Sequence, residues 1–230
     1  MGEPIQFASN GDTADGYLVR PPGGSGPGVI VVQEWWGLDW AIKEMADRLG
    51  SAGFVALAPD LYHGELAGHD EMDKAAQLMT QLPPDRAARD MSAAVDYLAG
   101  LPAVSGKGLG VVGFCMGGML SFLLAASRPD RIKAIVPFYG FPQGDVEPDW
   151  STMQAAVRGH MAENDDFFGP DAARALETKL QGMGKDATLT VHAGTGHAFM
   201  APHNALGTLD ADLAAEIWPG VVSFLHEQLD

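Results

Sequence analysis

The sequence has a single cysteine, few basic side chains and no long apolar run. One cysteine in 230 residues excludes an intramolecular disulfide, and nothing points to an oxidising compartment. Fourteen Lys and Arg face 30 Asp and Glu, and the net charge of −16 disfavours binding to nucleic acid or anionic membranes. No segment has the apolar length of a membrane span, and the first residues lack the pattern of a signal peptide. We therefore expect a cytoplasmic protein without nucleic-acid or membrane partners.

Motifs for metals and phosphates are also missing. There is no cysteine pair and no His-x-x-x-His pattern, and the glycine run at 23–28 lacks the Lys and Thr of a phosphate-binding loop. No metal and no cofactor is expected. No repeat or low-complexity tract divides the chain, so residues 1–230 are predicted to form one domain, and both a monomer and a homodimer remain open.

Strand and helix patterns alternate along the chain, which favours an α/β fold with a mostly parallel sheet and helices on both faces. Residues 5–8 and 16–20 resemble an antiparallel pair, and the Pro- and Gly-rich segment 21–28 is predicted to be a surface hairpin loop. The other expected strands are 29–32, 54–57, 109–112, 134–139, 155–161 and 187–192. The expected helices are 41–51, capped by Asp39, then 71–81, 84–99, 116–127, 171–181 and 209–228.

The segment Gly113-Phe114-Cys115-Met116-Gly117-Gly118 lies between an apolar strand and an apolar helix. It matches the G-x-S-x-G nucleophile elbow with cysteine in place of serine. A lone cysteine is usually a buried and inert residue, but this context favours a nucleophile. The helix amino terminus beneath Cys115 should also stabilise a thiolate.

A nucleophile of this kind needs a base and an orienting acid, in the chain order nucleophile, acid, histidine. His197 follows the last predicted strand and is the expected base, whereas His63, His69, His203 and His226 are interpreted as surface residues and His160 and His192 as strand residues. The acid should follow the strand at 155–161. Asp165 is favoured there over Asp166, and Glu163 is a weaker alternative.

Two further roles are predicted near the nucleophile. The backbone N–H groups of Met116 and Trp35 are expected to form the oxyanion hole. Glu34 ends an apolar strand, so its carboxylate either bonds to turn amides or lies close to Cys115 and tunes its protonation state.

Aromatic residues gather at the predicted carboxyl edge of the sheet, where sites in such folds lie. Some of them must belong to the core and others should line an apolar pocket, with Trp36, Tyr139 and Phe199 expected to bind substrate. The set comprises Trp35, Trp36, Trp40, Tyr139, Phe167, Phe168 and Phe199.

These motifs together resemble the dienelactone hydrolase (carboxymethylenebutenolidase) family, which has the α/β-hydrolase fold, over nearly the whole chain. The resemblance rests on residues 33–37 (QEWWG), 58–62 (APDLY), 113–118 (GFCMGG), 138–140 (FYG) and 196–199 (GHAF). It implies a Cys115–Asp165–His197 triad, contact between Glu34 and the resting cysteine, and release of the thiolate when substrate binds. It also implies a thioacyl-enzyme that water hydrolyses with His197 as base, and no cofactor.

One departure concerns the substrate. The family's dienelactone enzyme holds its substrate carboxylate with two arginines, but this chain has Met200-Ala201 after the histidine and no arginine between Arg48 and Arg86. A broader, more hydrophobic ester or lactone is therefore expected as the small-molecule substrate. The alternatives are another activated ester, such as a phosphoester, and a non-catalytic binder or thiol sensor on the same scaffold, although a sensor needs neither His197 nor an acid.

Overall fold

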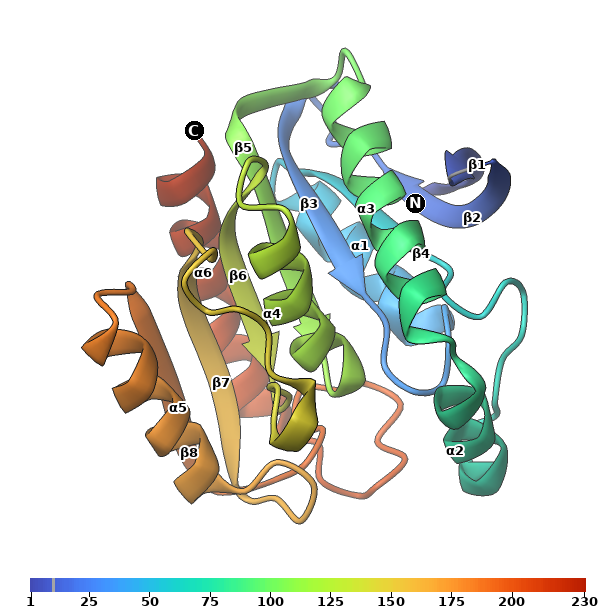
Figure 1. Ribbon diagram of the computed structural model, residues 1–230. Helices are drawn as coiled ribbons and strands as arrows, with labels where there is room; N and C mark the ends of the chain where they lie inside the picture. The colour runs from blue at the N-terminus through green and yellow to red at the C-terminus, as the bar shows by residue number, and fades with distance from the viewer. Residues whose placement is uncertain (10) are drawn as a thin grey trace.

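The computed structural model describes residues 1–9 and 11–230, and its described strands form one eight-stranded sheet in the order β1-β2-β4-β3-β5-β6-β7-β8 (Figure 1). The strands are β1 (Glu3–Ser9), β2 (Asp12–Val19), β3 (Gly26–Val32), β4 (Val55–Pro59), β5 (Val104–Phe114), β6 (Ile132–Phe138), β7 (Ala156–Asn164) and β8 (Ala187–Gly196). The helices are α1 (Trp40–Ser51), α2 (Met72–Gln81), α3 (Pro84–Gly100), α4 (Met116–Ser127), α5 (Pro170–Gly182) and α6 (Ala211–Leu229), with a short 3₁₀ turn, η1 (Gly144–Val146). This is the mixed α/β class that the sequence predicts.

The sheet is parallel from β4 through β3 to β8, whereas β2 runs antiparallel to both of its neighbours, β1 and β4. The predicted hairpin at 21–28 is wrong, because β2 pairs with β4 and not with β3. Gly26 and Gly28 belong to β3 itself, where a Cβ would lie 1.9 Å from the Gly53 carbonyl oxygen and 2.5 Å from a Leu109 methyl group respectively. These glycines are therefore close-packing positions of a buried strand.

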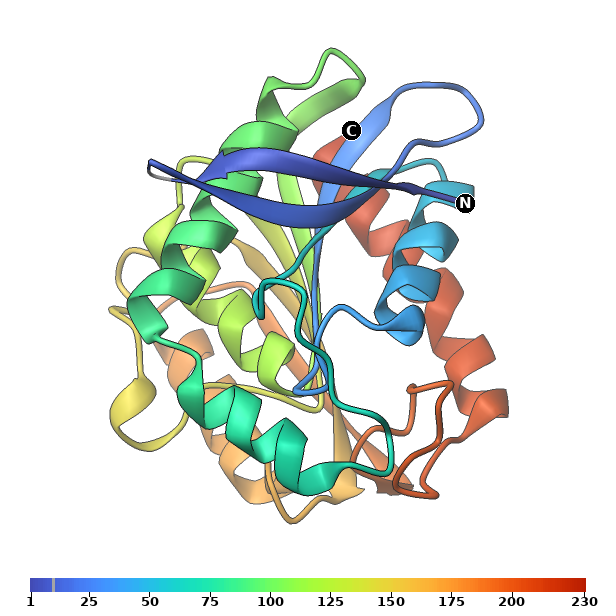
Figure 2. The ribbon, with the colours of Figure 1, turned by 90° about the vertical axis from the view of Figure 1, so that its right-hand side faces the viewer.

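Apolar side chains on the two faces of the sheet form two separate cores. Helices α3, α4 and α5 cover one face, and α1 and α6 cover the other (Figure 2). The central strand β3 is buried at every position, which explains its continuous apolar run. Among the described residues, no helix combines the length and apolarity needed to cross a bilayer.

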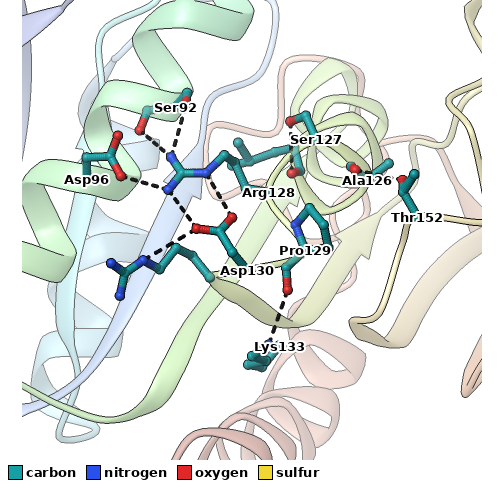
Figure 3. Close-up of polar contacts among 11 residues, drawn as sticks. Ser92, Asp96, Ala126, Ser127, Arg128, Pro129, Asp130, Lys133 and Thr152 are labelled. Atoms are coloured by element: carbon teal, nitrogen blue, oxygen red, sulfur yellow. Dashed lines mark hydrogen bonds and ion pairs between the residues drawn. The ribbon is translucent and has the colours of Figure 1, made fainter.

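Arg128 fixes the carboxyl end of α4 to α3 (Figure 3). Its guanidinium donates to the backbone and side-chain oxygens of Ser92 at 3.1 and 2.9 Å and to Asp96 at 2.7 Å. It also pairs with Asp130, and these carboxylates raise the pKa of Arg128. A cation at a helix carboxyl terminus complements the helix dipole. The contacts anchor the helix whose other end carries Cys115.

Candidate active site

Cys115 lies at the junction of β5 and α4 in a strained backbone conformation. Its φ is 54° and its ψ is −117°, a region that residues with a Cβ rarely adopt. The backbone N–H donates to the Phe138 carbonyl at 3.0 Å, and the carbonyl accepts from Gly118 and Met119. The turn therefore projects the side chain beyond the carboxyl edge of the sheet, as the predicted elbow requires.

Glycines around the turn allow this close approach. A Cβ on Gly113 would lie 2.1 Å from the Gly117 carbonyl oxygen, and one on Gly117 would lie 2.3 Å from the Val32 carbonyl oxygen. A Cβ on Gly140 would lie 1.8 Å from the Cys115 carbonyl oxygen. Only hydrogen fits at these positions, so the glycine pattern follows from the packing of α4 against β3 and β6.

His197 follows β8 directly and is held by Asp165. The Nδ1 atom lies 2.8 Å from Oδ2 of Asp165, and both side chains are buried. The other carboxylate oxygen of Asp165 accepts from the backbone N–H groups of Phe167 and Phe168, each at 2.9 Å. Asp165 thus fixes the ring with Nδ1 protonated, and among residues 1–9 and 11–230 Nε2 has no hydrogen-bond partner.

The other candidate acids are placed differently. Asp166 is exposed and lines the pocket, while Glu163 accepts a hydrogen bond from the Gly194 backbone at 2.9 Å. The structure therefore brings Asp165 to His197, and neither alternative touches the ring.

Burial raises the pKa of the Cys115 thiol, and the Glu34 carboxylate and then that of Asp165 raise it further. The Met116 backbone N–H acts in the opposite direction, but its effect is smaller than that of burial. The predicted stabilisation of a thiolate by the helix terminus is thus outweighed, and the resting group is a thiol. Among the described residues no hydrogen bond joins this sulfur to the His197 ring or to Glu34, although all three line one cavity.

Glu34 is buried and pairs with His203, which sequence reasoning missed. Its Oε2 lies 2.8 Å from Nε2 of His203, whose side chain is only 1% exposed. Its Oε1 is buried without a partner in the described chain. The expectation that His203 lies at the surface is wrong, and so is the alternative that Glu34 bonds only to turn amides.

The surface prediction also fails for His69, which bonds through Nε2 to the buried Asp39 at 2.7 Å and is 23% exposed. No local pattern marks either ring. Only a chemical argument could have predicted the role of His203. A buried Glu34 requires a hydrogen-bond donor, and the loop after β8 contains a second histidine.

The two predicted oxyanion donors, Met116 and Trp35, both line the cavity that contains Cys115. The Met116 backbone N–H is close enough to the Cys115 sulfur to lower its pKa, and Met116 is the first residue of α4. In the described chain the Trp35 backbone N–H donates to no protein group, and Trp35 follows β3 beside the pocket. Both amides are thus available to a developing negative charge.

A cavity of about 550 Å³ opens above Cys115. Its wall is mostly aromatic and aliphatic, and its lining includes no Lys or Arg. The charged or ionisable members are Glu34, Cys115, Asp166, His197 and His203. The remaining members are Trp35, Trp36, Met79, Met116, Met119, Gln143, Val146, Phe167, Phe168, Ala198 and Leu206.

The cavity corrects part of the predicted substrate set. Trp36 lines it, but Tyr139 and Phe199 are not among its lining residues and pack in the core on one face of the sheet. The Tyr139 ring packs edge-on against His197 and Phe199, with centroids 5.2 and 5.5 Å apart. Tyr139, which follows β6, therefore packs directly against the His197 ring, and Phe199 packs against Tyr139.

The strand order, the elbow after β5 and the histidine after β8 define an α/β-hydrolase. The model of the dienelactone hydrolase family matches residues 14–229, so the chain belongs to that family and is a carboxylic-ester hydrolase.

Relatives and a solved structure agree over the full length. The chain is 38% identical to "Protein usf" of Aquifex pyrophilus and 34% identical to a putative carboxymethylenebutenolidase of Aquifex aeolicus, covering all of each chain. A putative dienelactone hydrolase from Klebsiella pneumoniae superposes with a TM-score of 0.86 at 25% identity, covering 99% of this chain and 98% of the other.

Proposed function

We propose that the protein hydrolyses carboxylic esters or lactones with Cys115 as nucleophile and through a thioacyl-enzyme. One observation carries the proposal: a strained Cys115 shares a cavity with His197, whose Nδ1 is fixed by buried Asp165 and whose Nε2 bonds to no other described residue. A free imidazole nitrogen beside a raised-pKa thiol is the arrangement needed for paired proton transfer and attack.

In the first half-reaction, the thiol proton moves to Nε2 of His197 as sulfur attacks the ester carbonyl carbon. The carbonyl oxygen becomes an oxyanion, which the Met116 and Trp35 amides stabilise. When the carbon–oxygen bond breaks, His197 returns its proton to the leaving oxygen. An alcohol departs, or stays attached as the opened end of a lactone, and the acyl group remains on sulfur.

In the second half-reaction, His197 takes a proton from water, and the hydroxide attacks the thioester. The carbon–sulfur bond breaks, the carboxylic acid leaves, and sulfur recovers its proton. Asp165 keeps the imidazole oriented and stabilises its positive charge in both steps. Glu34 opposes ionisation of the free enzyme, so the thiolate forms when substrate occupies the pocket.

The cavity favours neutral, hydrophobic acyl or aryl groups. Its wall is apolar, and its fixed negative charges, Glu34 and Asp166, have no Lys or Arg beside them. An anionic substrate would lose hydration without gaining a counter-ion. This expectation follows from the cavity itself and agrees with the missing arginine positions.

The nucleophile is tested with p-nitrophenyl butyrate and iodoacetamide. Cys115→Ala and the alkylated enzyme should lose turnover, and Cys115→Ser should keep little because a hydroxyl is a poor nucleophile here. His63→Gln is the matched control, since His63 binds the carboxylate of Asp90 at 2.8 Å outside the cavity. Unchanged turnover after complete alkylation would contradict the proposal.

The substrate class is tested with two esters of equal length, p-nitrophenyl butyrate and the singly charged mono-p-nitrophenyl succinate. The neutral ester should have the higher kcat/KM by about tenfold or more. Asp166→Asn should improve the anionic ester a few-fold. Equal turnover of both esters would contradict a cavity that selects against charge.

A further inference from the structure

Behind Glu34 lies a second system of histidines and carboxylates that the proposed mechanism does not use. It comprises Asp39, His69 and His203, from three segments that are distant in sequence: the start of α1, the β4–α2 loop and the β8–α6 loop. Figure 2 shows the two loops reaching toward the lower part of the view. Among the described residues, no hydrogen bond joins any of the three to the Cys115 sulfur, whereas His203 bonds to Glu34, so we look for a role that acts through Glu34.

His203 is locked as a neutral donor. The Ala205 backbone N–H donates to its Nδ1 at 3.0 Å. A backbone N–H cannot accept, so Nδ1 carries no proton and the ring proton sits on Nε2, where it bonds to Oε2 of Glu34 at 2.8 Å. Both ring nitrogens are therefore occupied, which excludes His203 as an acid or base without a change in its loop.

His69 and Asp39 hold the His203 ring in place. The two imidazoles stack with centroids 4.2 Å apart and planes 28° apart. Asp39 accepts from Nε2 of His69 at 2.7 Å with one oxygen and from the Ile42 backbone at 3.0 Å with the other, as the cap of α1. Trp36 packs edge-on against both rings. The first turn of α1 thereby fixes the direction of the His203 bond.

The bond to His203 determines which oxygen of Glu34 remains unbonded. Because Oε2 is held by His203, Oε1 is the oxygen left without a partner, and it is buried. Glu34 lines one cavity with Cys115 and a second, small cavity with Tyr139, whose hydroxyl is also buried without a partner in the described chain, so the carboxylate lies beside both residues.

We propose that His203, backed by the Asp39–His69 pair, is a positioning residue that holds the Glu34 carboxylate in a fixed orientation beside Cys115. The inference rests on the proposed nucleophilic role of Cys115. It adds a specific arrangement: Glu34 acts through an orientation set by a neutral imidazole and a helix cap, and no arginine or lysine takes part.

The test uses the chain's single cysteine, because iodoacetamide alkylation then reports on Cys115 alone and needs no turnover. Cys115 faces the carboxylates of Glu34 and Asp165 and shares its cavity with His197 and His203, so the full pH profile of alkylation is recorded. Removing the Glu34 charge with Glu34→Gln should move the profile to lower pH by about one unit. His203→Phe should move it in the same direction, since the carboxylate loses its donor.

The double variant Glu34→Gln/His203→Phe makes the test decisive. If His203 acts through Glu34, the double variant has the profile of Glu34→Gln alone. His203→Gln, which retains an N–H donor, should restore most of the parent profile, and kcat/KM should fall about tenfold in His203→Phe and recover in His203→Gln. His63→Phe removes an equivalent histidine–carboxylate pair outside the cavity and should leave the profile unchanged.

Additive shifts in the double variant, or an unmoved profile in His203→Phe, overturn the proposal. If His203→Phe does not fold by circular dichroism, the cycle uses His203→Asn, which is too short to reach Glu34. If neither the parent nor any variant hydrolyses esters but the alkylation profiles shift as predicted, the role of His203 stands. Only the proposed hydrolytic function is then refuted.

Discussion

Two histidine–carboxylate pairs, Asp165–His197 and Glu34–His203, each place a histidine at the cavity of Cys115, and they differ in which group keeps an unbonded atom. In the pair Asp165–His197, both carboxylate oxygens are occupied, and one ring nitrogen has no partner among residues 1–9 and 11–230. In the pair Glu34–His203, both ring nitrogens are occupied and one carboxylate oxygen is free in the described chain. The same two kinds of group, an imidazole and a carboxylate, therefore leave a proton acceptor on the imidazole in one pair and on the carboxylate in the other.

This difference gives the two pairs different roles in the proposed mechanism. His197 can shuttle a proton during both half-reactions, and its carboxylate only orients it. Glu34 opposes premature ionisation of the thiol, and its histidine only orients it. The difference comes from the backbone: amides of Phe167 and Phe168 saturate Asp165, whereas the amide of Ala205 saturates His203.

The largest difference between the pairs should appear on exchanging each histidine for glutamine. His197→Gln removes the proton acceptor and should lower kcat/KM for p-nitrophenyl butyrate about 10³-fold. His203→Gln keeps a donor to Glu34 and should cost less than tenfold. Steady-state kinetics on both variants decide this, and equal losses would show that the pairs do not differ as described.

The carboxylates give the next largest effect. Asp165→Asn loses the charge that orients and stabilises the imidazolium, so kcat should fall about 10²-fold or more. Glu163→Gln is the neighbouring control, since its exposed carboxylate bonds only to the Gly194 backbone. A similar fall in both variants would mean that local disruption, rather than the bond to His197, causes the loss.

A third pair, His160 and His192, has no carboxylate bonded to either ring, and it should make the fold acid-sensitive. Their rings are bonded at 3.0 Å, and burial lowers the pKa of His160 to about 3 and also lowers that of His192. The unfolded chain takes up protons below about pH 6.5 while folded His160 stays neutral, so stability falls as the pH drops toward 3.

At pH 4.5 the loss from His160 should reach about 3 kcal/mol relative to pH 8. Urea unfolding of the parent and of His160→Gln at both pH values measures it. The variant should lose less stability between them, and an identical pH dependence in both proteins would refute this assignment.

The smallest effect concerns the cap that supports His69. Asp39→Ala removes the bond to the Ile42 backbone and should cost about 1 kcal/mol of unfolding free energy. Asp39→Asn retains a capping oxygen and should cost less. Thermal unfolding of both variants gives the ranking, and the reverse order would show that the cap is not what Asp39 contributes.

Sequence reasoning succeeded where the determinants are local. The elbow at Cys115 is defined within six residues by glycines that no side chain could replace, and the positions after β7 and β8 led to Asp165 and His197. Strand and helix order followed from the same alternation of apolar segments. These features depend on neighbours in the chain, which the sequence displays directly.

The failures concern contacts between distant segments. His203 lies 169 residues from Glu34, and no periodicity links them. The aromatic residues at the carboxyl edge of the sheet predict substrate contacts for Tyr139 and Phe199, but both are buried in the core. The composition of the edge does not distinguish residues that line the cavity from residues that pack behind it. The hairpin prediction failed because β4 inserts between β2 and β3, a pairing that the intervening loop does not reveal.

The nucleophilic role of Cys115 is tested most directly by trapping the acyl group on its sulfur. His197→Gln should form the thioester slowly and hydrolyse it more slowly still, so mixing it with p-nitrophenyl butyrate and quenching in acid should accumulate the intermediate. We predict one butyryl group per chain by intact mass spectrometry, located on the peptide that contains Cys115. An acyl group on another residue, or p-nitrophenol release without any adduct in this variant and in the parent alike, would contradict the account.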